Sequence, residues 1–147
     1  MSALAELASL PRSSFPYVER QATRWNDNDV YGHVNNVVHY MLFDTTVNAW
    51  LIREGGLDIH RDPVIGLCIE SGCVYHAALE YPAPIDVALR VGHLGRSSVE
   101  YQLALFAPGA ECPAANGRFV HVFVARQDRR PTPIPDRLRA SLERLTV

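Results

Sequence analysis

The chain of 147 residues contains no lysine, and all 14 of its basic residues are arginine. The absence of lysine excludes mechanisms in which a lysine forms a Schiff base or acts as a general base. No apolar run approaches the roughly 20 residues that a membrane-spanning helix requires. The mildly apolar N-terminus is interrupted by Glu6 and has no basic residue before it, so we expect no secretory signal. These features predict a cytoplasmic protein without a membrane partner.

Several other signatures are missing. Net charge is −2, which gives no indication of a nucleic-acid partner. The three cysteines, Cys68, Cys73 and Cys112, form no C-x-x-C pair, and we predict buried thiols rather than a disulfide framework or a zinc site. The six histidines show no ligand spacing such as H-E-x-x-H, so no metal is predicted. No glycine-rich phosphate loop and no G-x-S-x-G are present, which excludes nucleotide-loop and serine-hydrolase chemistry.

What the chain does contain is one long apolar helix among strands. Hydrophobic residues make up 48% of the sequence, typical of a folded globular domain. Helical spacing of apolar residues predicts a helix over 37–54, ended by Gly55-Gly56. Segregation of one helix from several strands indicates an α+β fold with an antiparallel sheet against that helix. Strands are predicted at 17–25, 63–79, 86–94, 97–106 and 118–126, with bends or bulges at Gly66 and Gly72 and a short helix at 136–145. Residues 17–147 are assigned to a single domain and residues 1–16 to a loosely ordered tail.

The polar turn before the long helix is the most informative segment. Residues 27–36 hold two aspartates, three asparagines and one glycine. A helix N-terminus presents unpaired N–H groups and the positive end of the helix dipole, which together hold anions or polarise carbonyls. The same residue types also make ordinary turns and helix caps, so composition alone leaves both interpretations open.

The order of residues in this turn is more specific. Residues 27–36 read D-x-D-x-x-G-H-V-N-N, residues 95–98 read G-R-S-S, and residues 130–135 read R-P-T-P-I-P. Together these blocks resemble the 4-hydroxybenzoyl-CoA thioesterase-like branch of the hotdog-fold acyl-CoA thioesterases, over residues 17 to about 142. The resemblance implies a hotdog fold, in which a five-stranded antiparallel sheet is wrapped around one long central helix. It also implies a homodimer or homotetramer with the active site at the subunit interface.

The resemblance assigns roles within the turn. The family's catalytic carboxylate matches Asp29, which would act as a general base or as a nucleophile. Asp27 matches the first acid of the motif and is expected to be structural. The backbone N–H near Asn36 would polarise the thioester carbonyl. His33 either orients water or substrate, or is a hydrogen-bonded turn histidine.

Further residues are candidates for substrate binding. Arg96 in the G-R-S-S turn suits a phosphate of coenzyme A, because arginine binds phosphate in bidentate fashion, although hairpin turns commonly carry a solvated arginine. The full set of predicted substrate-binding residues is Tyr31, Asn35, Tyr40, Arg96, Ser97 and Ser98.

Other residues near the motif receive different predictions. Asp44 is expected to hydrogen-bond a polar strip on the helix, and becomes the catalytic alternative if Asp29 is not used. His39 is expected to face solvent or a partner subunit. A tunnel for the acyl group would be lined by Tyr40, Phe43, Val47 and Ile69.

The function implied is hydrolysis of an acyl-CoA thioester to a free carboxylic acid and coenzyme A. No cofactor is required, since coenzyme A is part of the substrate. Two alternatives remain at this point: a thioesterase acting on acyl-carrier protein, and a non-catalytic hotdog module that binds acyl-CoA. The identity of the acyl group is not predicted.

Overall fold

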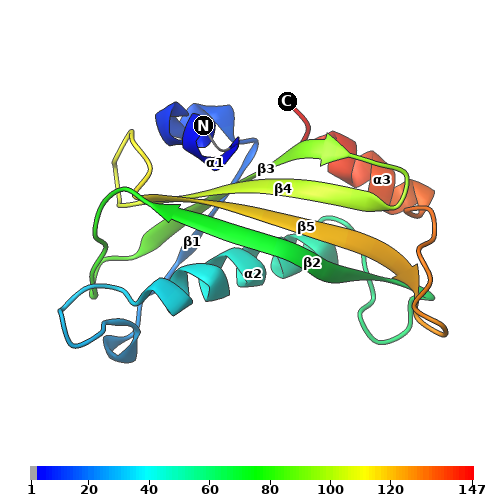
Figure 1. The fold of residues 1–147 in the computed structure, drawn as a ribbon, viewed down its shortest axis with the longest axis horizontal. Coiled ribbons are helices and arrows are strands. Elements are labelled where there is room, and N and C mark those ends of the chain that lie inside the picture. The colour runs from blue at the N-terminus through cyan, green and yellow to red at the C-terminus, as the bar shows by residue number, and fades with distance from the viewer. Residues whose placement is uncertain (1–2) are drawn as a thin grey trace.

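The computed structural model describes residues 3–147, and its centre is a five-stranded antiparallel sheet wrapped along one long helix. The helix α2 (Asn36–Arg53) lies along one face of the sheet (Figure 1). The strands are arranged in the order β1-β3-β4-β5-β2, with bounds β1 (Tyr17–Gln21), β2 (Val64–Tyr75), β3 (Ile85–Leu94), β4 (Ser98–Phe106) and β5 (Ala115–Ala125). The predicted α+β hotdog architecture is confirmed.

The main core lies between α2 and the sheet. Alternate residues of β4, from Val99 to Leu105, are completely buried and face Phe43 and Val47 of the helix. Gly117 of β5 lets the helix approach closely, because a Cβ there would lie 2.6 Å from the Phe43 ring. No helix in the described part of the chain is long and apolar enough to cross a membrane.

The opposite face of the sheet is covered by the N-terminal segment. It contains α1 (Ala3–Glu6) and two short 3₁₀ turns, Leu7–Ser9 and Arg12–Ser14, which lie across the sheet from α2 (Figure 1). Residues 3–16 therefore differ from the loosely ordered tail that the sequence predicts. The physical reason is burial of apolar side chains, since Leu7 and Phe15 are both buried.

Two contacts attach this segment to strands far away in the sequence. The Phe15 ring packs edge-on against Phe106 with 6.2 Å between ring centroids. The Arg12 guanidinium donates to the Asp86 carboxylate at 2.6 Å, and Arg20 donates to the same carboxylate at 2.8 Å. These arginines hold the pKa of Asp86 below its usual value. The segment also explains why Ala104, on the face of β4 away from α2, is buried.

Several element boundaries differ from the predicted ones. β1 stops at Gln21, because the chain turns into a 3₁₀ helix at Trp25–Asp27. β2 stops at Tyr75, four residues early, where its pairing with β5 ends. β5 begins at Ala115 rather than at 118, because residues 115–117 pair with both β4 and β2.

The bulge and the cysteines also differ from expectation. The register shift in β2 falls between Cys68 and Glu70, not at Gly66 or Gly72. Cys68 and Cys112 are exposed and Cys73 is half-buried, so the prediction of three buried thiols is wrong. Cys68 lies on β2, which is an edge strand of the described sheet.

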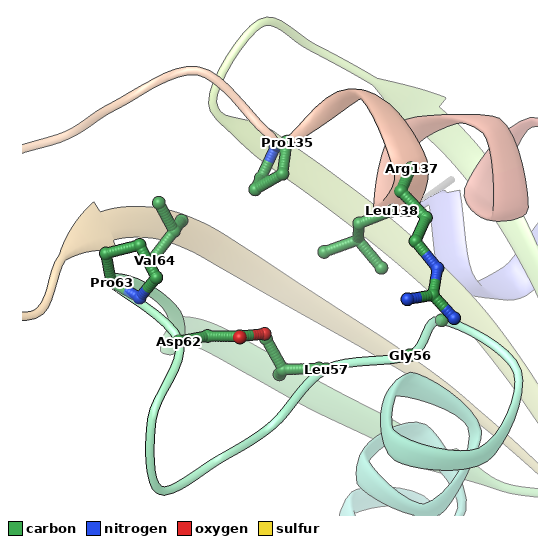
Figure 2. Close-up of a pocket in the computed structure, with 9 residues that line it drawn as sticks. Gly56, Leu57, Asp62, Pro63, Val64, Pro135, Arg137 and Leu138 are labelled. Atoms are coloured by element: carbon green, nitrogen blue, oxygen red, sulfur yellow. The ribbon is translucent and has the colours of Figure 1, made fainter.

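The last helix, α3 (Asp136–Glu143), closes the end of the domain beyond the C-terminus of α2. Ser141 donates to the Glu54 carbonyl at 3.2 Å, and Leu138 packs into the main core. A pocket of about 240 Å³ lies between α3 and the loop that leads into β2. Figure 2 shows Arg137 reaching from α3 toward Gly56 at its rim. Gly56 has φ +71° and no side chain, which leaves room for the guanidinium.

Two buried polar side chains in the main core lack partners. The Tyr101 hydroxyl and His121 Nδ1 have no hydrogen bond within residues 3–147, and the two rings meet edge-on with 4.9 Å between centroids. Desolvation lowers the pKa of His121 from 6.5 to about 4 and raises the pKa of Tyr101. His121 is therefore neutral in the folded chain at neutral pH.

This burial predicts a loss of stability in mild acid. Between about pH 6.5 and about pH 4 the unfolded chain binds a proton at His121 that the folded chain does not, so acid favours unfolding. The loss across this window is roughly 3 kcal/mol, at 1.36 kcal/mol per pKa unit. Urea unfolding at several pH values should show it, and His121→Leu should flatten the dependence. His60→Gln, at an exposed position, should leave it unchanged. A His121→Leu chain with the full wild-type pH dependence would contradict the assignment.

Candidate active site

The loop before α2 is held in place by Asp27. Asp27 is 1% exposed, and its carboxylate accepts three hydrogen bonds from Arg24: from the backbone N–H at 2.8 Å, from Nε at 3.0 Å and from Nη2 at 2.8 Å. The Asp27 carbonyl accepts the Asn35 N–H at 2.8 Å, which joins the loop to the start of the helix. All of these contacts are structural, as the motif predicted for the first acid.

Asp29 is arranged differently from Asp27. It is half-buried, and its Oδ1 accepts the Tyr31 N–H at 2.9 Å in a tight turn. The turn is closed by the Asp29 N–H, which donates to the His33 carbonyl at 2.8 Å, and by Gly32, whose φ is +85°. Within residues 3–147, Oδ2 has no hydrogen-bond partner. Asp29 therefore offers a carboxylate oxygen that the fold does not use.

The first turn of α2 leaves one N–H group free. The Asn35 side chain caps the helix by accepting the Val37 N–H at 2.9 Å, and the Asn35 carbonyl accepts the Val38 N–H at 2.9 Å. The Asn36 N–H has no partner in the described part of the chain. A hydrogen-bond donor is thus available at the positive end of the helix dipole.

His39 lies one turn further along α2 and is only 4% exposed, so the expectation that it faces solvent or a partner is wrong. Its Nδ1 is 3.1 Å from the Asn35 carbonyl, and its ring meets Tyr75 edge-on at 4.9 Å between centroids. Burial lowers the pKa of His39. The spacing of four residues between Asn35 and His39 could have predicted this position of His39 from the sequence, because it places both residues on one side of the helix.

These side chains border one pocket of about 400 Å³. The three predicted catalytic residues, Asp29, His33 and Asn36, all line it, and the structure brings them together. His33 is exposed at its rim. The rest of the wall comprises Val34, His39, Tyr75 and residues 76–79. Of these, His39 and Tyr75 were missed as site residues by the sequence analysis.

The predicted substrate-binding residues are not all at this pocket. Asn35 is adjacent to it as the helix cap, whereas Tyr31 projects from the tip of the turn and is 83% exposed. Tyr40 is half-buried and packs against Phe119 at 6.2 Å between ring centroids, away from the pocket wall.

The turn with Arg96, Ser97 and Ser98 lies at the other end of the sheet. Ser98 pairs with Val122, whereas Tyr75 at the pocket pairs with Ala115, seven residues earlier on β5. At about 3.4 Å per residue this separation is roughly 24 Å. One chain alone therefore does not bring this turn to the pocket.

The expected tunnel is not formed within one chain. Phe43 and Val47 are completely buried against the sheet, whereas Ile69 is 63% exposed on the edge strand. Asp44 is exposed on α2 and accepts a hydrogen bond from the Asn48 amide at 3.2 Å, as expected for a polar strip. In residues 3–147 no group of three or more His, Cys, Asp or Glu side chains is placed to hold a metal ion.

The two aspartates of the motif should respond differently to the same substitution. Asp27→Asn replaces one oxygen of a buried carboxylate with an NH₂ group, which cannot accept from Arg24, and should lower the free energy of unfolding by about 1–2 kcal/mol. Asp29→Asn keeps an acceptor for the Tyr31 N–H and should change the free energy of unfolding by less than about 0.5 kcal/mol. Urea unfolding of both variants checks this contrast. Equal losses, or a larger loss for Asp29→Asn, would show that the structural roles are assigned the wrong way round.

Comparisons with known proteins bear on this site. The sequence matches the model of the thioesterase-like superfamily over residues 23–142. A search of curated proteins found no match. The solved structure of the PA5185 protein from Pseudomonas aeruginosa strain PAO1 is 50% identical, with a TM-score of 0.91 over 93% of this chain and 96% of that one.

Two more distant structures share the fold. The 1,4-dihydroxy-2-naphthoyl-CoA thioesterase Slr0204 from Synechocystis is 13% identical, with a TM-score of 0.77 over 86% of this chain and 94% of that one. The SAV2348 protein from Staphylococcus aureus, solved in complex with CoA, is 15% identical, with a TM-score of 0.79 over 86% and 81%.

Proposed function

The chain belongs to the thioesterase-like superfamily, and on that premise we propose that it hydrolyses an acyl-CoA thioester to a free carboxylic acid and coenzyme A. The observation that carries the proposal is the pairing, at one pocket, of an uncommitted carboxylate oxygen of Asp29 with an uncommitted N–H of Asn36. The same pocket residues, Asp29, His33 and Asn36, are the catalytic residues proposed from the motif.

The chemistry of thioester cleavage fits these two groups. Attack on the carbonyl carbon places negative charge on the carbonyl oxygen, and a fixed N–H donor at a helix start stabilises that charge. Asp29 supplies either the base that deprotonates water or the nucleophile that forms a mixed anhydride. His33, exposed at the pocket rim, is proposed to orient water or the substrate.

Coenzyme A as the carrier of the acyl group is supported by the fold neighbours. SAV2348 was solved with CoA, and Slr0204 is a CoA thioesterase. In this chain Arg96, Ser97 and Ser98 are proposed to bind the nucleotide phosphates, and Tyr31, Asn35 and Tyr40 to border the substrate.

A second copy of the chain is needed to bring these parts together. β2 is an edge strand of 12 residues, and it carries exposed large apolar side chains together with α2: Val37, Met41, Ile52, Ile69 and Tyr75. An edge of this kind is commonly covered by self-association. We propose a homodimer, or a homotetramer of such dimers, in which the β2 edges run antiparallel. The Arg96 turn of one copy then lies at the same end of the assembly as the Asp29 pocket of the other.

The catalytic proposal predicts the effect of one substitution. Asp29→Asn keeps the shape of the side chain and removes its charge, so kcat for thiol release from a panel of acyl-CoA esters should fall by about a hundredfold or more. Asp44→Asn is the matched control, since Asp44 lies outside the pocket. Full activity in Asp29→Asn would show that Asp29 is not the catalytic carboxylate and would make Asp44 the candidate. Binding of acyl-CoA without turnover by the unaltered chain would identify a ligand-binding module, and turnover of acyl-carrier protein alone would identify the other thioesterase class.

The assembly proposal predicts a difference between the two edges of the sheet. Ile69→Arg places a charge in the middle of β2 and should convert the dimer to monomers with lost activity, as measured by light scattering and thiol release. Val18→Arg is the control on β1, the opposite edge strand, where Val18 is 39% exposed. A monomeric but fully active Ile69→Arg chain would refute the need for the second copy.

A further inference from the structure

The hydrogen bond of His39 determines where its proton lies. Its Nδ1 is 3.1 Å from the Asn35 carbonyl oxygen. A carbonyl oxygen only accepts hydrogen bonds, so Nδ1 carries the hydrogen of the neutral ring and Nε2 carries the lone pair. Within residues 3–147, Nε2 has no hydrogen-bond partner. The imidazole is therefore held in one tautomer with a free proton-accepting nitrogen.

The ring is also fixed in position at the pocket. His39 lines the same wall as Asp29 and Asn36, one helical turn after Asn36. Tyr75 of β2 packs against the ring edge at 4.9 Å between centroids, and its hydroxyl donates to the Asn36 carbonyl at 3.5 Å. Contacts from both the helix and the strand therefore fix the imidazole in the pocket that Asn36 also lines.

The other ionisable groups around this wall come from three elements. Asp29 and His33 belong to the loop before α2, Tyr75 to β2, and His76 to the segment after β2. His76 is bonded through Nε2 to Asn116 at 2.9 Å. Among the described residues of the wall no arginine or lysine is present to repel a proton from His39.

We propose that His39 is a catalytic residue, the base that accepts the proton of the hydrolytic water at this pocket. The inference rests on the proposed thioesterase function and deepens it by separating the roles of Asp29 and His39. With His39 as the base, Asp29 is the nucleophile.

The proposed reaction consists of formation of a mixed anhydride and its hydrolysis. An Asp29 oxygen bonds to the thioester carbonyl carbon, the C–S bond breaks, and coenzyme A leaves as a thiolate, giving a mixed anhydride. Water then attacks the acyl carbon, Nε2 of His39 takes its proton, and the bond to Asp29 breaks to release the acid and the carboxylate. The imidazolium returns its proton to the thiolate. One thioester and one water thus yield one acid and one thiol.

The lowered pKa of His39 is consistent with this role. Burial lowers the pKa of His39, because it disfavours the imidazolium, and so favours the neutral ring that carries the free lone pair. A carboxylate that serves as the nucleophile cannot accept the proton of the second step while it is acylated, so that step requires a separate base.

The decisive experiment is chemical rescue of His39→Ala. Steady-state thiol release by the variant should fall by about a hundredfold or more in kcat, because hydrolysis of the mixed anhydride is slowed. Added imidazole should raise the kcat of the variant at least tenfold. Pyrazole, a ring of the same size and much weaker basicity, should not raise it, because proton transfer follows base strength. Equal rescue by both rings would assign His39 a packing role and overturn the proposal.

A second variant guards against a folding defect. His39→Asn keeps an N–H that can reach the Asn35 carbonyl and removes the free lone pair. It should retain the wild-type melting temperature and lose kcat to the same extent, whereas wild-type kcat would overturn the proposal. His60→Ala, an exposed histidine, should be fully active and unaffected by imidazole. Loss of activity in Asp29→Asn with full activity in His39→Asn would defeat this inference alone and leave the thioesterase function standing.

Discussion

The joint between the loop before α2 and the first turn of that helix is the constraint on which the rest of the site depends. Asp27 closes the loop on Arg24, and the Asp27 carbonyl accepts the Asn35 N–H. The Val34 N–H in turn donates to the Leu79 carbonyl at 2.7 Å, which ties the helix start to the segment after β2. The first N–H groups of a helix have no partner within the helix itself. Asn35 accepts those of Val37 and Val38, and the Asn36 N–H is left without a partner in residues 3–147.

The sequence predicted the elements whose signals are local. The apolar spacing of residues 37–54 and the Gly55-Gly56 stop are properties of neighbouring residues, and α2 was located to within about one residue at each end. The Asp27-to-Asn36 motif is also local, so Asp29, His33 and Asn36 were found together. Local patterns did not predict the N-terminal segment, because its order comes from Phe106 and Asp86, which lie more than 70 residues away. His39 was misplaced for the same reason, since its burial depends on Tyr75 of β2.

The way the sheet encloses α2 limits where an acyl chain can lie. The buried side of the helix is filled by Phe43 and Val47, and Gly117 is required to admit the Phe43 ring at all. Protein interiors packed to this density have no room for an inserted chain. The exposed side of α2 and the β2 edge carry further large apolar side chains, among them Met41 and Ile69. In the proposed dimer, space for the acyl group therefore lies where the second copy covers that side.

Comparison of the two buried histidines shows what separates a structural group from a chemical one. His121 and His39 are both desolvated, and in both the pKa is lowered by burial. His121 Nδ1 is buried in the core with no partner among residues 3–147, so its burial destabilises the fold, and more strongly in acid. His39 instead donates from Nδ1 to the Asn35 carbonyl, and it borders a pocket that Asp29 also lines. Burial favours the neutral form of each ring, but only a ring with a fixed tautomer and an accessible lone pair can accept a proton from water.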